Sequence, residues 1–145
     1  MVINKLARRE YQIGDTYVAG VALTGAEVKS LREGRGSLRD GYVKIINGEL
    51  FLVGVDLPQY SHYSGVEYDA KRSRKLLMKA KEILKIQKQI EGKPLTLVPL
   101  KLFFKGRWAK CEIGVGKGKR EWEKRADLKA RDIKRDLAKA VKNTV

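Results

Sequence analysis

The pair Asn47-Gly48 narrows the possible folds of this chain more than any other feature, because it separates two short apolar segments. YVKII (42–46) precedes the pair and ELFLVGV (49–55) follows it. Asn-Gly favours the two-residue type I′ turn, which joins antiparallel strands. The sequence therefore predicts a β-hairpin here.

Three more segments have the composition of strands. Residues 11–23 are rich in Tyr, Ile and Val, and Gly14-Asp15 marks a turn or bulge inside them, so one long bent strand or two short ones are predicted. A second hairpin is predicted from residues 95–104 and 107–115, with its turn at Lys105-Gly106.

The second hairpin carries the pattern of a half-buried strand. Pro99 lacks a backbone N–H and favours a bulge or an edge position. Alternate residues of the following strand are small or apolar and are predicted to face the core: Ala109, Cys111, Ile113 and Val115. On this pattern Cys111 is an inert core residue.

A short helix is predicted after residue 23. Thr24 and Glu27 fit the capping box, in which each side chain binds a backbone N–H of the other residue, so Glu27 is interpreted as a structural cap. Val28 and Leu31 are predicted to face the core, and Gly34 is suited to the end of the helix.

A longer helix is predicted from Ser73 to Gly92, after a polar loop at residues 57–70. The loop contains His62, which is interpreted as a solvated residue. The predicted buried face of the helix consists of Leu76, Leu77, Ala80, Ile83, Leu84 and Ile90.

These elements predict a mainly β fold with helices. About five or six short antiparallel strands with two or three helices suit a small closed or partly open β-barrel of the oligonucleotide-binding type. Residues 1–116 are predicted to form this domain, and residues 117–145 to form a basic C-terminal tail.

Positive charge is concentrated in two stretches of the chain. The formal net charge is +15, and residues 71–88 carry eight cations and one acid, while residues 117–145 carry eleven cations and five acids. Such concentration on a nearly neutral body is typical of nucleic-acid binding. A membrane-surface role is disfavoured because neither stretch has a bulky apolar face, and no run of eighteen apolar residues is present.

The tail has a narrow apolar stripe that would bury little area against a core, so an RNA surface is expected to order it as a helix. Trp122 lies among cations and either stacks on a base or packs against the body. Residues 114–119 (GVGKGK) lack the Walker A spacing and are interpreted as a flexible basic hinge whose backbone approaches phosphates.

Little in the sequence indicates catalysis. One His and one Cys provide neither a zinc site nor a Cys–His dyad, and no cofactor, metal ligand or catalytic residue is predicted. The single Cys and the absence of an apolar signal segment favour a soluble protein of the reducing cytoplasm. A minor alternative is a metal-dependent ribonuclease whose carboxylates converge on Mg²⁺: Asp15, Asp40, Asp56 and Asp69.

Several segments in this order resemble the small protein B (SmpB) family, the tmRNA-binding proteins of bacterial trans-translation. They are NKLARREYQI, AGVALTGAEVKSLREGR, NGELFLVG, RSRKLLMK, LTLVPLKLFFK and GVGKGKREWEKR. The resemblance implies a non-enzymatic adaptor that binds the tRNA-like domain of tmRNA and brings it to stalled ribosomes. It implies that the tail enters the decoding centre and the empty mRNA channel, and it allows elongation factor Tu as a further partner.

The resemblance also implies which residues contact RNA. The expected tmRNA-binding residues are Asn4, Lys5, Arg8, Tyr11, Arg32, Arg72, Arg74, Lys75 and Leu77. The expected decoding-centre residues are Lys117, Gly118, Lys119, Arg120, Trp122, Glu123, Lys124 and Arg125. Val18 departs from the family, which usually has Glu at this RNA-contacting position. From the residues alone, Tyr11 is a core residue of its strand.

The leading hypothesis is thus a non-catalytic RNA-binding adaptor that works on the ribosome. A general RNA-binding or ribosomal protein with the same fold is the alternative within the binding class, and it would bind any structured RNA with similar affinity. The ribonuclease is the alternative within the enzyme class.

Overall fold

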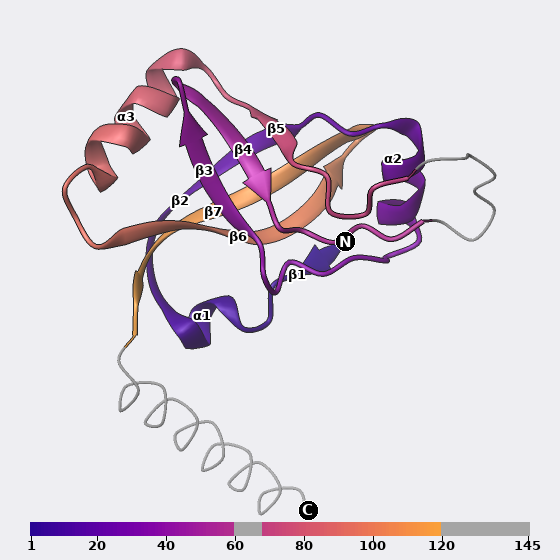
Figure 1. The fold of residues 1–145 in the computed structure, drawn as a ribbon, viewed down its shortest axis with the longest axis horizontal. Coiled ribbons are helices and arrows are strands. Elements are labelled where there is room, and N and C mark those ends of the chain that lie inside the picture. The colour runs from indigo at the N-terminus through magenta and orange to yellow at the C-terminus, as the bar shows by residue number, and fades with distance from the viewer. Residues whose placement is uncertain (60–67, 120–145) are drawn as a thin grey trace, which may run out of the picture.

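Seven strands and three helices lie within residues 1–59 and 68–119, the part of the chain that this computed structural model describes (Figure 1). The strands are β1 (Val2–Ile3), β2 (Tyr11–Val21), β3 (Tyr42–Ile46), β4 (Glu49–Val53), β5 (Arg74–Leu77), β6 (Leu95–Lys105) and β7 (Trp108–Gly118). The helices are α1 (Ala7–Glu10), α2 (Gly25–Arg32) and α3 (Ala80–Ile90).

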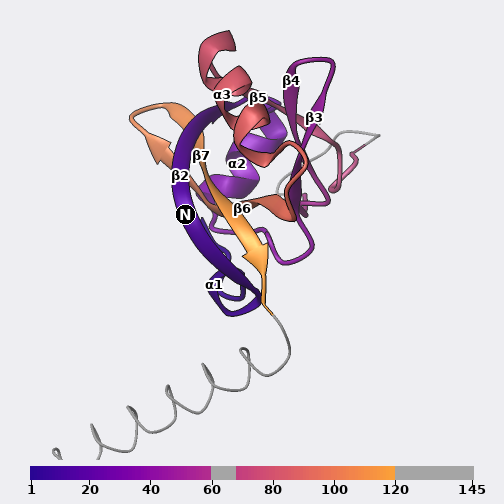
Figure 2. The ribbon, with the colours of Figure 1, turned by 90° about the vertical axis from the view of Figure 1, so that its left-hand side faces the viewer.

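The strand pairings form a closed circuit. Neighbouring strands follow the order β6-β3-β4-β5-β2-β7, and β7 then pairs with β6 again. All these pairings are antiparallel, and β1 also pairs with β6, at residues 101–102. In Figures 1 and 2, α1 and α3 lie at opposite ends of this strand body. The mainly antiparallel β fold with helices that the sequence predicts is thereby confirmed.

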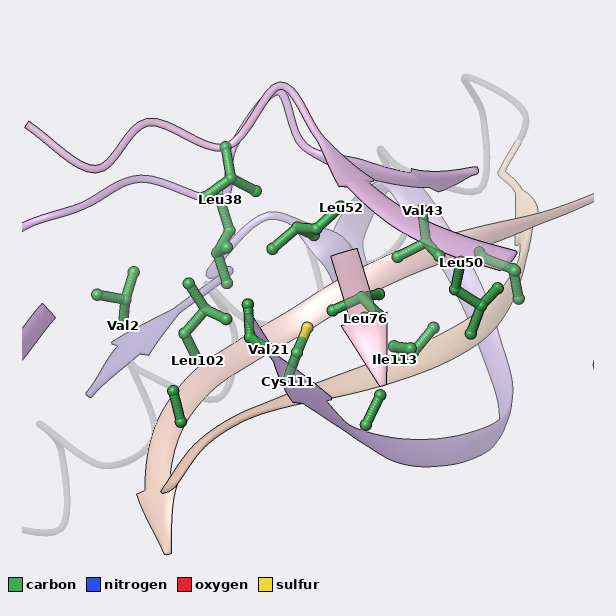
Figure 3. Close-up of a cluster of buried hydrophobic side chains, with 14 of the residues drawn as sticks. Val2, Val21, Leu38, Val43, Leu50, Leu52, Leu76, Leu102, Cys111 and Ile113 are labelled. Carbon is green, nitrogen blue, oxygen red and sulfur yellow. The ribbon is translucent and has the colours of Figure 1, made fainter. Parts of the chain in front are cut away.

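The main core lies inside the circuit (Figure 3). Inward residues of the strands meet α2 through Leu31 and α3 through Ile83 and Ile86. Cys111 is buried here as predicted, and apolar burial raises the pKa of its thiol to about 12. Each large aliphatic side chain buried in this way contributes about 1.5–3 kcal/mol to stability.

Both predicted hairpins are present. Asn47 (φ 50°) and Gly48 (φ 75°) have the two positive φ values of a type I′ turn between β3 and β4. In the second hairpin Lys105 pairs with Trp108, so the turn is Gly106-Arg107, one residue later than predicted. Gly106 (φ 63°) supplies the positive φ that a type II′ turn needs at its first central residue.

Two register shifts bend the long strands. One falls between Ile13 and Thr16, which confirms the bulge predicted at Gly14-Asp15 and shows that β2 is one long strand. The other falls between Pro99 and Lys101, as the missing N–H of proline predicts.

Helix α2 begins with the predicted capping box. The Glu27 N–H donates to Thr24 Oγ1 (3.3 Å), and the Thr24 N–H donates to Glu27 Oε1 (2.8 Å). Leu31 is buried, Val28 is half-buried, and Gly34 follows the last turn with φ 74°. The prediction for this helix is confirmed.

The helix predicted from Ser73 to Gly92 is wrong in its first third. Residues 74–77 form β5, which pairs with β4 and β2, and α3 begins only at Ala80. Long-range pairing overrides the helical spacing there, because alternate residues of the segment face inside and outside. Leu77 is consequently exposed rather than buried. In α3 itself, Leu84 and Ala80 are also exposed, and Ile83 and Ile86 form the buried face.

The predicted basic hinge is also wrong, since residues 114–118 belong to β7 and pair with β2. A Cβ at Gly114 would lie 2.9 Å from Ile13 Cγ2, and one at Gly116 would lie 3.0 Å from Tyr11 Cβ. These glycines therefore make room for side chains of β2. Those side chains pack beside a second, smaller core under α1, formed by Ala7, Val98 and Leu100.

Parts of three predictions lie outside the described residues. They are residues 60–67 of the polar loop, which include His62, the tail after Lys119, and the stacking or packing role of Trp122. No described helix is long and apolar enough to span a membrane.

Candidate nucleic-acid interface

The strands β6, β7, β2 and β5 carry one continuous outer face. Their register places Phe103, Lys110, Gly20 and Leu77 in a row across the four strands. A parallel row consists of Ile3 on β1, then Lys101, Glu112 and Val18. A third row begins with Lys105 and Trp108 at the hairpin tip. It continues with Ala22, directly after β2, whose N–H donates to the carbonyl of Lys75 on β5. These three rows are called the outer face below.

The outer face mixes cations with exposed apolar groups. Val18 and Leu77 are each 53% exposed, and Trp108 is 64% exposed. Lys101 Nζ lies 3.3 Å from Glu112 Oε2 and 5.0 Å from the centre of the Phe103 ring. Among the described residues, Glu112 is the single acid in the three rows, so the face as a whole is basic.

Helix α1 extends this basic surface. A hollow of about 420 Å³ is lined by Asn4, Lys5 and Arg8 together with Ile3, Lys101 and Glu112 of the outer face. Lys5 and Arg8 are both exposed. The fold therefore brings the predicted residues Lys5 and Arg8, just before and in α1, and those of β5, about seventy positions later, onto one side of the molecule.

Asn4 and Tyr11 have structural contacts. The Asn4 side-chain amide donates to the carbonyls of Pro99 (3.0 Å) and Leu38 (3.3 Å). The residues alone predict Tyr11 to be a core residue of its strand, and it is half-buried and packs against the small core under α1. Both residues also line a second hollow of about 280 Å³ that includes Arg39.

Arg74 is the clear exception among the predicted RNA contacts. Its side chain is 0% exposed, and its Nε donates to Glu27 Oε2 at 2.6 Å. Its remaining nitrogens donate to the carbonyls of Val55 (2.8 Å) and Ala70 (2.9 Å). The expectation that Arg74 faces RNA is therefore wrong, because its hydrogen bonds are all made inside the protein.

Glu27 is the centre of this buried ion cluster. Burial alone would raise its pKa, but the hydrogen bond from Arg72, the Thr24 N–H and the charge of Arg74 outweigh burial and hold the pKa below its usual 4.5. The carboxylate thus links α2 to β5 through Arg74. Near it, the hydroxyls of Ser30 and Tyr68 both donate to the Pro58 carbonyl.

Arg72 connects the buried cluster to the surface. Its Nη2 donates to Glu27 Oε1 (2.6 Å) and to the Ala22 carbonyl (3.3 Å), yet 42% of its side chain is exposed. The hydrogen bond with Glu27 raises the pKa of Arg72. Its guanidinium is therefore held in place next to Ala22, beside the outer face.

The other predicted cations have separate surroundings. Lys75 is exposed, and its Nζ lies 3.3 Å from Glu49 Oε1. Arg32, at the end of α2, lies over the Phe104 ring at 4.5 Å. Lys117 and Gly118 are the exposed last residues of β7, and the Lys119 N–H donates to the Glu10 carbonyl. The remaining predicted tail residues lie outside the described part: Arg120, Trp122, Glu123, Lys124 and Arg125.

Sequence reasoning missed the residues of the β6–β7 hairpin that complete the outer face. They are Lys101, Phe103, Lys105, Trp108 and Lys110. The alternation in residues 108–115 predicts that Trp108 and Lys110 point away from the core, but not which strands lie beside them. As for the proposed cluster of aspartates, no group of three or more potential metal ligands occurs within residues 1–59 and 68–119.

Comparison with known proteins adds to this geometry. A family model described as "SmpB protein" matches residues 1–143. The chain belongs to the SmpB family. An SsrA-binding protein of Microcystis aeruginosa is 51% identical over 140 residues, which cover 96% of this chain and 91% of the relative. One of Nocardioides is 51% identical over 138 residues, covering 95% and 87%.

A solved structure extends the SmpB comparison to three dimensions. It is described as "tmRNA-SmpB: a journey to the center of the bacterial ribosome", and one of its chains is 40% identical with a TM-score of 0.70. The similarity covers 82% of this chain and 84% of that chain. The resemblance to the SmpB family that the motifs indicate is thus confirmed in both sequence and fold.

Proposed function

We propose that this chain is a non-catalytic RNA-binding adaptor of trans-translation that binds tmRNA through its outer face. Support comes from its family, from relatives named SsrA-binding proteins and from a structural neighbour whose description names tmRNA and the bacterial ribosome. The observation that carries the proposal is the register of β6, β7, β2 and β5. It places cations and exposed apolar side chains on one surface.

The mode of recognition follows from the chemistry of this surface. Lys5, Arg8 and Lys110 bind phosphates, while Leu77 and Val18 offer apolar contact to sugars and bases. The closed circuit of strands is a small barrel of the oligonucleotide-binding type that presents these groups on a rigid support. A folded RNA is then recognised by the shape of its backbone rather than by a run of unpaired bases.

The tail has a separate task in this proposal. Residues 117–125 and the helix expected after them enter the decoding centre and the empty mRNA channel of a stalled ribosome in the cytoplasm. Elongation factor Tu accompanies the adaptor during delivery. Support for this division comes from the charge of residues 117–145, which carry eleven cations and five acids and so form a second basic element besides the outer face.

A salt-titrated binding assay with tmRNA and an ordinary tRNA tests the proposal. The wild-type chain is compared with a Lys5→Ala/Lys110→Ala variant, and Lys85→Ala/Lys88→Ala on α3 serves as a charge-matched control. We expect a preference for tmRNA, a marked loss of affinity in the first variant and a smaller loss in the control. Equal affinity for both RNAs would support the general RNA-binding alternative instead.

The division of labour is tested in the full chain with Lys124→Ala/Arg125→Ala. We expect nearly unchanged affinity for tmRNA together with loss of peptide tagging on stalled ribosomes. A parallel loss of affinity would contradict the separate role of the tail.

A further inference from the structure

The indole of Trp108 is unusually exposed for a residue of a paired β-strand. Trp108 is 64% exposed although it belongs to β7 and pairs with Lys105 across the hairpin. Such a large apolar side chain is usually well buried in a soluble protein. Its exposure therefore calls for an explanation outside the packing of this chain.

The residues next to Trp108 anchor the hairpin tip to the core. The next residue, Ala109, is buried, and Phe104 packs against the main core while the Arg32 guanidinium lies 4.5 Å above its ring. The type II′ turn at Gly106 closes the hairpin directly before the indole. A partner that binds Trp108 therefore meets a hairpin whose backbone is already paired, and only the indole side chain has to be ordered on binding.

Cations surround the indole. Arg107 lies 5.4 Å from the indole centre, Lys105 is paired opposite, and Lys110 is next on the same side of β7. Among residues 1–59 and 68–119, no carboxylate forms an ion pair with any of these three cations. A flat aromatic face among unneutralised cations matches a nucleobase that is linked to phosphates.

We propose that Trp108 is a base-stacking site, where one unpaired nucleobase of the bound RNA stacks on the indole while Lys105 and Arg107 hold its flanking phosphates. The inference rests on the proposed function, because it extends the outer face to the hairpin tip. The outer face otherwise recognises the backbone and shape of the RNA, and Trp108 adds a contact with the plane of one base.

Fluorescence of Trp108 tests the stacking directly. In a Trp122→Phe background Trp108 is the remaining tryptophan, since the chain has two. Titration with transcribed tmRNA is expected to quench its emission in parallel with binding. An unquenched indole in a chain that binds tmRNA with wild-type affinity would overturn the inference.

Affinity measurements in the same background supply the second test. Trp108→Ala is expected to weaken binding by about 5-fold to about 150-fold, the range for loss of one stacked base, and Trp108→Phe to restore most of it. The slope of log affinity against log salt concentration is expected to stay unchanged in Trp108→Ala. In Lys105→Ala its magnitude is expected to fall by about one, because only this variant removes a phosphate contact. Leu84→Ala on α3, also an exposed apolar residue, is the control and is expected to bind normally.

The outcomes separate this inference from the proposed function. If Trp108→Ala binds as tightly as its parent while Lys5→Ala/Lys110→Ala binds weakly, the stacking site is wrong and the outer face remains. If the parent chain shows no preference for tmRNA, both proposals fail. Equal thermal stability of Trp108→Ala and its parent confirms that any loss arises from the contact.

Discussion

The two sides of β5 differ in burial although both carry one cation and one leucine. Arg74 and Leu76 point inward and are 0% and 1% exposed, whereas Lys75 and Leu77 point outward onto the outer face. The inner pair holds the fold together, whereas the outer pair is exposed, and the ion pair between Lys75 and Glu49 is exposed with it. A count of cations in this segment therefore overestimates the charge available to RNA, because alternation sends every second side chain inside.

Removal of Glu27 should have the largest effect on the inner side. Glu27→Ala leaves the Arg74 guanidinium buried without a counter-charge, which should cost about 3–5 kcal/mol in the free energy of unfolding. Glu49→Ala breaks the exposed ion pair with Lys75 and should cost less than about 1 kcal/mol. Urea unfolding of both variants measures the difference, and similar costs would refute the distinction between the two sides.

The adjacent leucines give the next largest contrast. Leu76→Ala should lower the free energy of unfolding by about 2–5 kcal/mol, because it opens a cavity in the main core. Leu77→Ala should change stability by no more than about 0.5 kcal/mol while it weakens RNA binding. Denaturation and RNA titration of the same two samples check both halves, and a Leu77→Ala variant that melts early would contradict the assignment of β5.

Acid should weaken the inner side through Glu27. Its pKa is lower in the folded chain than the usual 4.5, so ionised Glu27 contributes stability above about pH 4.5, and that contribution disappears as the pH falls through the folded pKa. The free energy of unfolding should therefore fall more steeply below pH 4.5 in the wild type than in Glu27→Gln. Parallel pH profiles of the two proteins would show that Glu27 is not coupled to folding.

The smallest expected effect concerns single cations of the outer side. Lys110→Ala should reduce the magnitude of the slope of log affinity against log salt by about one. Between about 50 and about 200 mM salt, the variant should therefore lose about fourfold less affinity than the wild type. Its thermal stability should not change, since no described carboxylate pairs with it. Salt titrations of wild type and variant test this, and an unchanged slope would remove Lys110 from the interface.

Local signals predicted much of this fold correctly. Asn47-Gly48, the Thr24–Glu27 capping box and Pro99 each act through a few adjacent residues, so their consequences are readable without the rest of the chain. The alternation around Cys111 likewise placed that side chain in the core.

Features that depend on distant partners were not predictable in the same way. β5 has four residues and becomes a strand because β4 and β2 lie on either side of it. Arg74 is buried because Glu27, 47 positions earlier, neutralises it. The glycines of β7 were interpreted as a hinge, since their contacts with Ile13 and Tyr11 appear only once the strands pair.

The candidate site was predicted in part. Lys5, Arg8, Lys75 and Leu77 are exposed on or beside the outer face, in agreement with the resemblance. The contribution of β6 and β7 was missed because it depends on register, which sequence patterns define poorly across a sheet.

The closed circuit of strands has a consequence for how the chain folds during synthesis. Tyr11 at the start of β2 pairs with Gly118 at the end of β7, so residues roughly a hundred positions apart must meet before the circuit closes. Topologies with such high contact order fold slowly, in milliseconds to seconds. Helix α2 and the β3–β4 hairpin can form early from local contacts, but β2 lacks its main partner until the residues of β7 have been translated. Premature termination before residue 108 would thus leave a polypeptide with an unpaired, aggregation-prone strand edge.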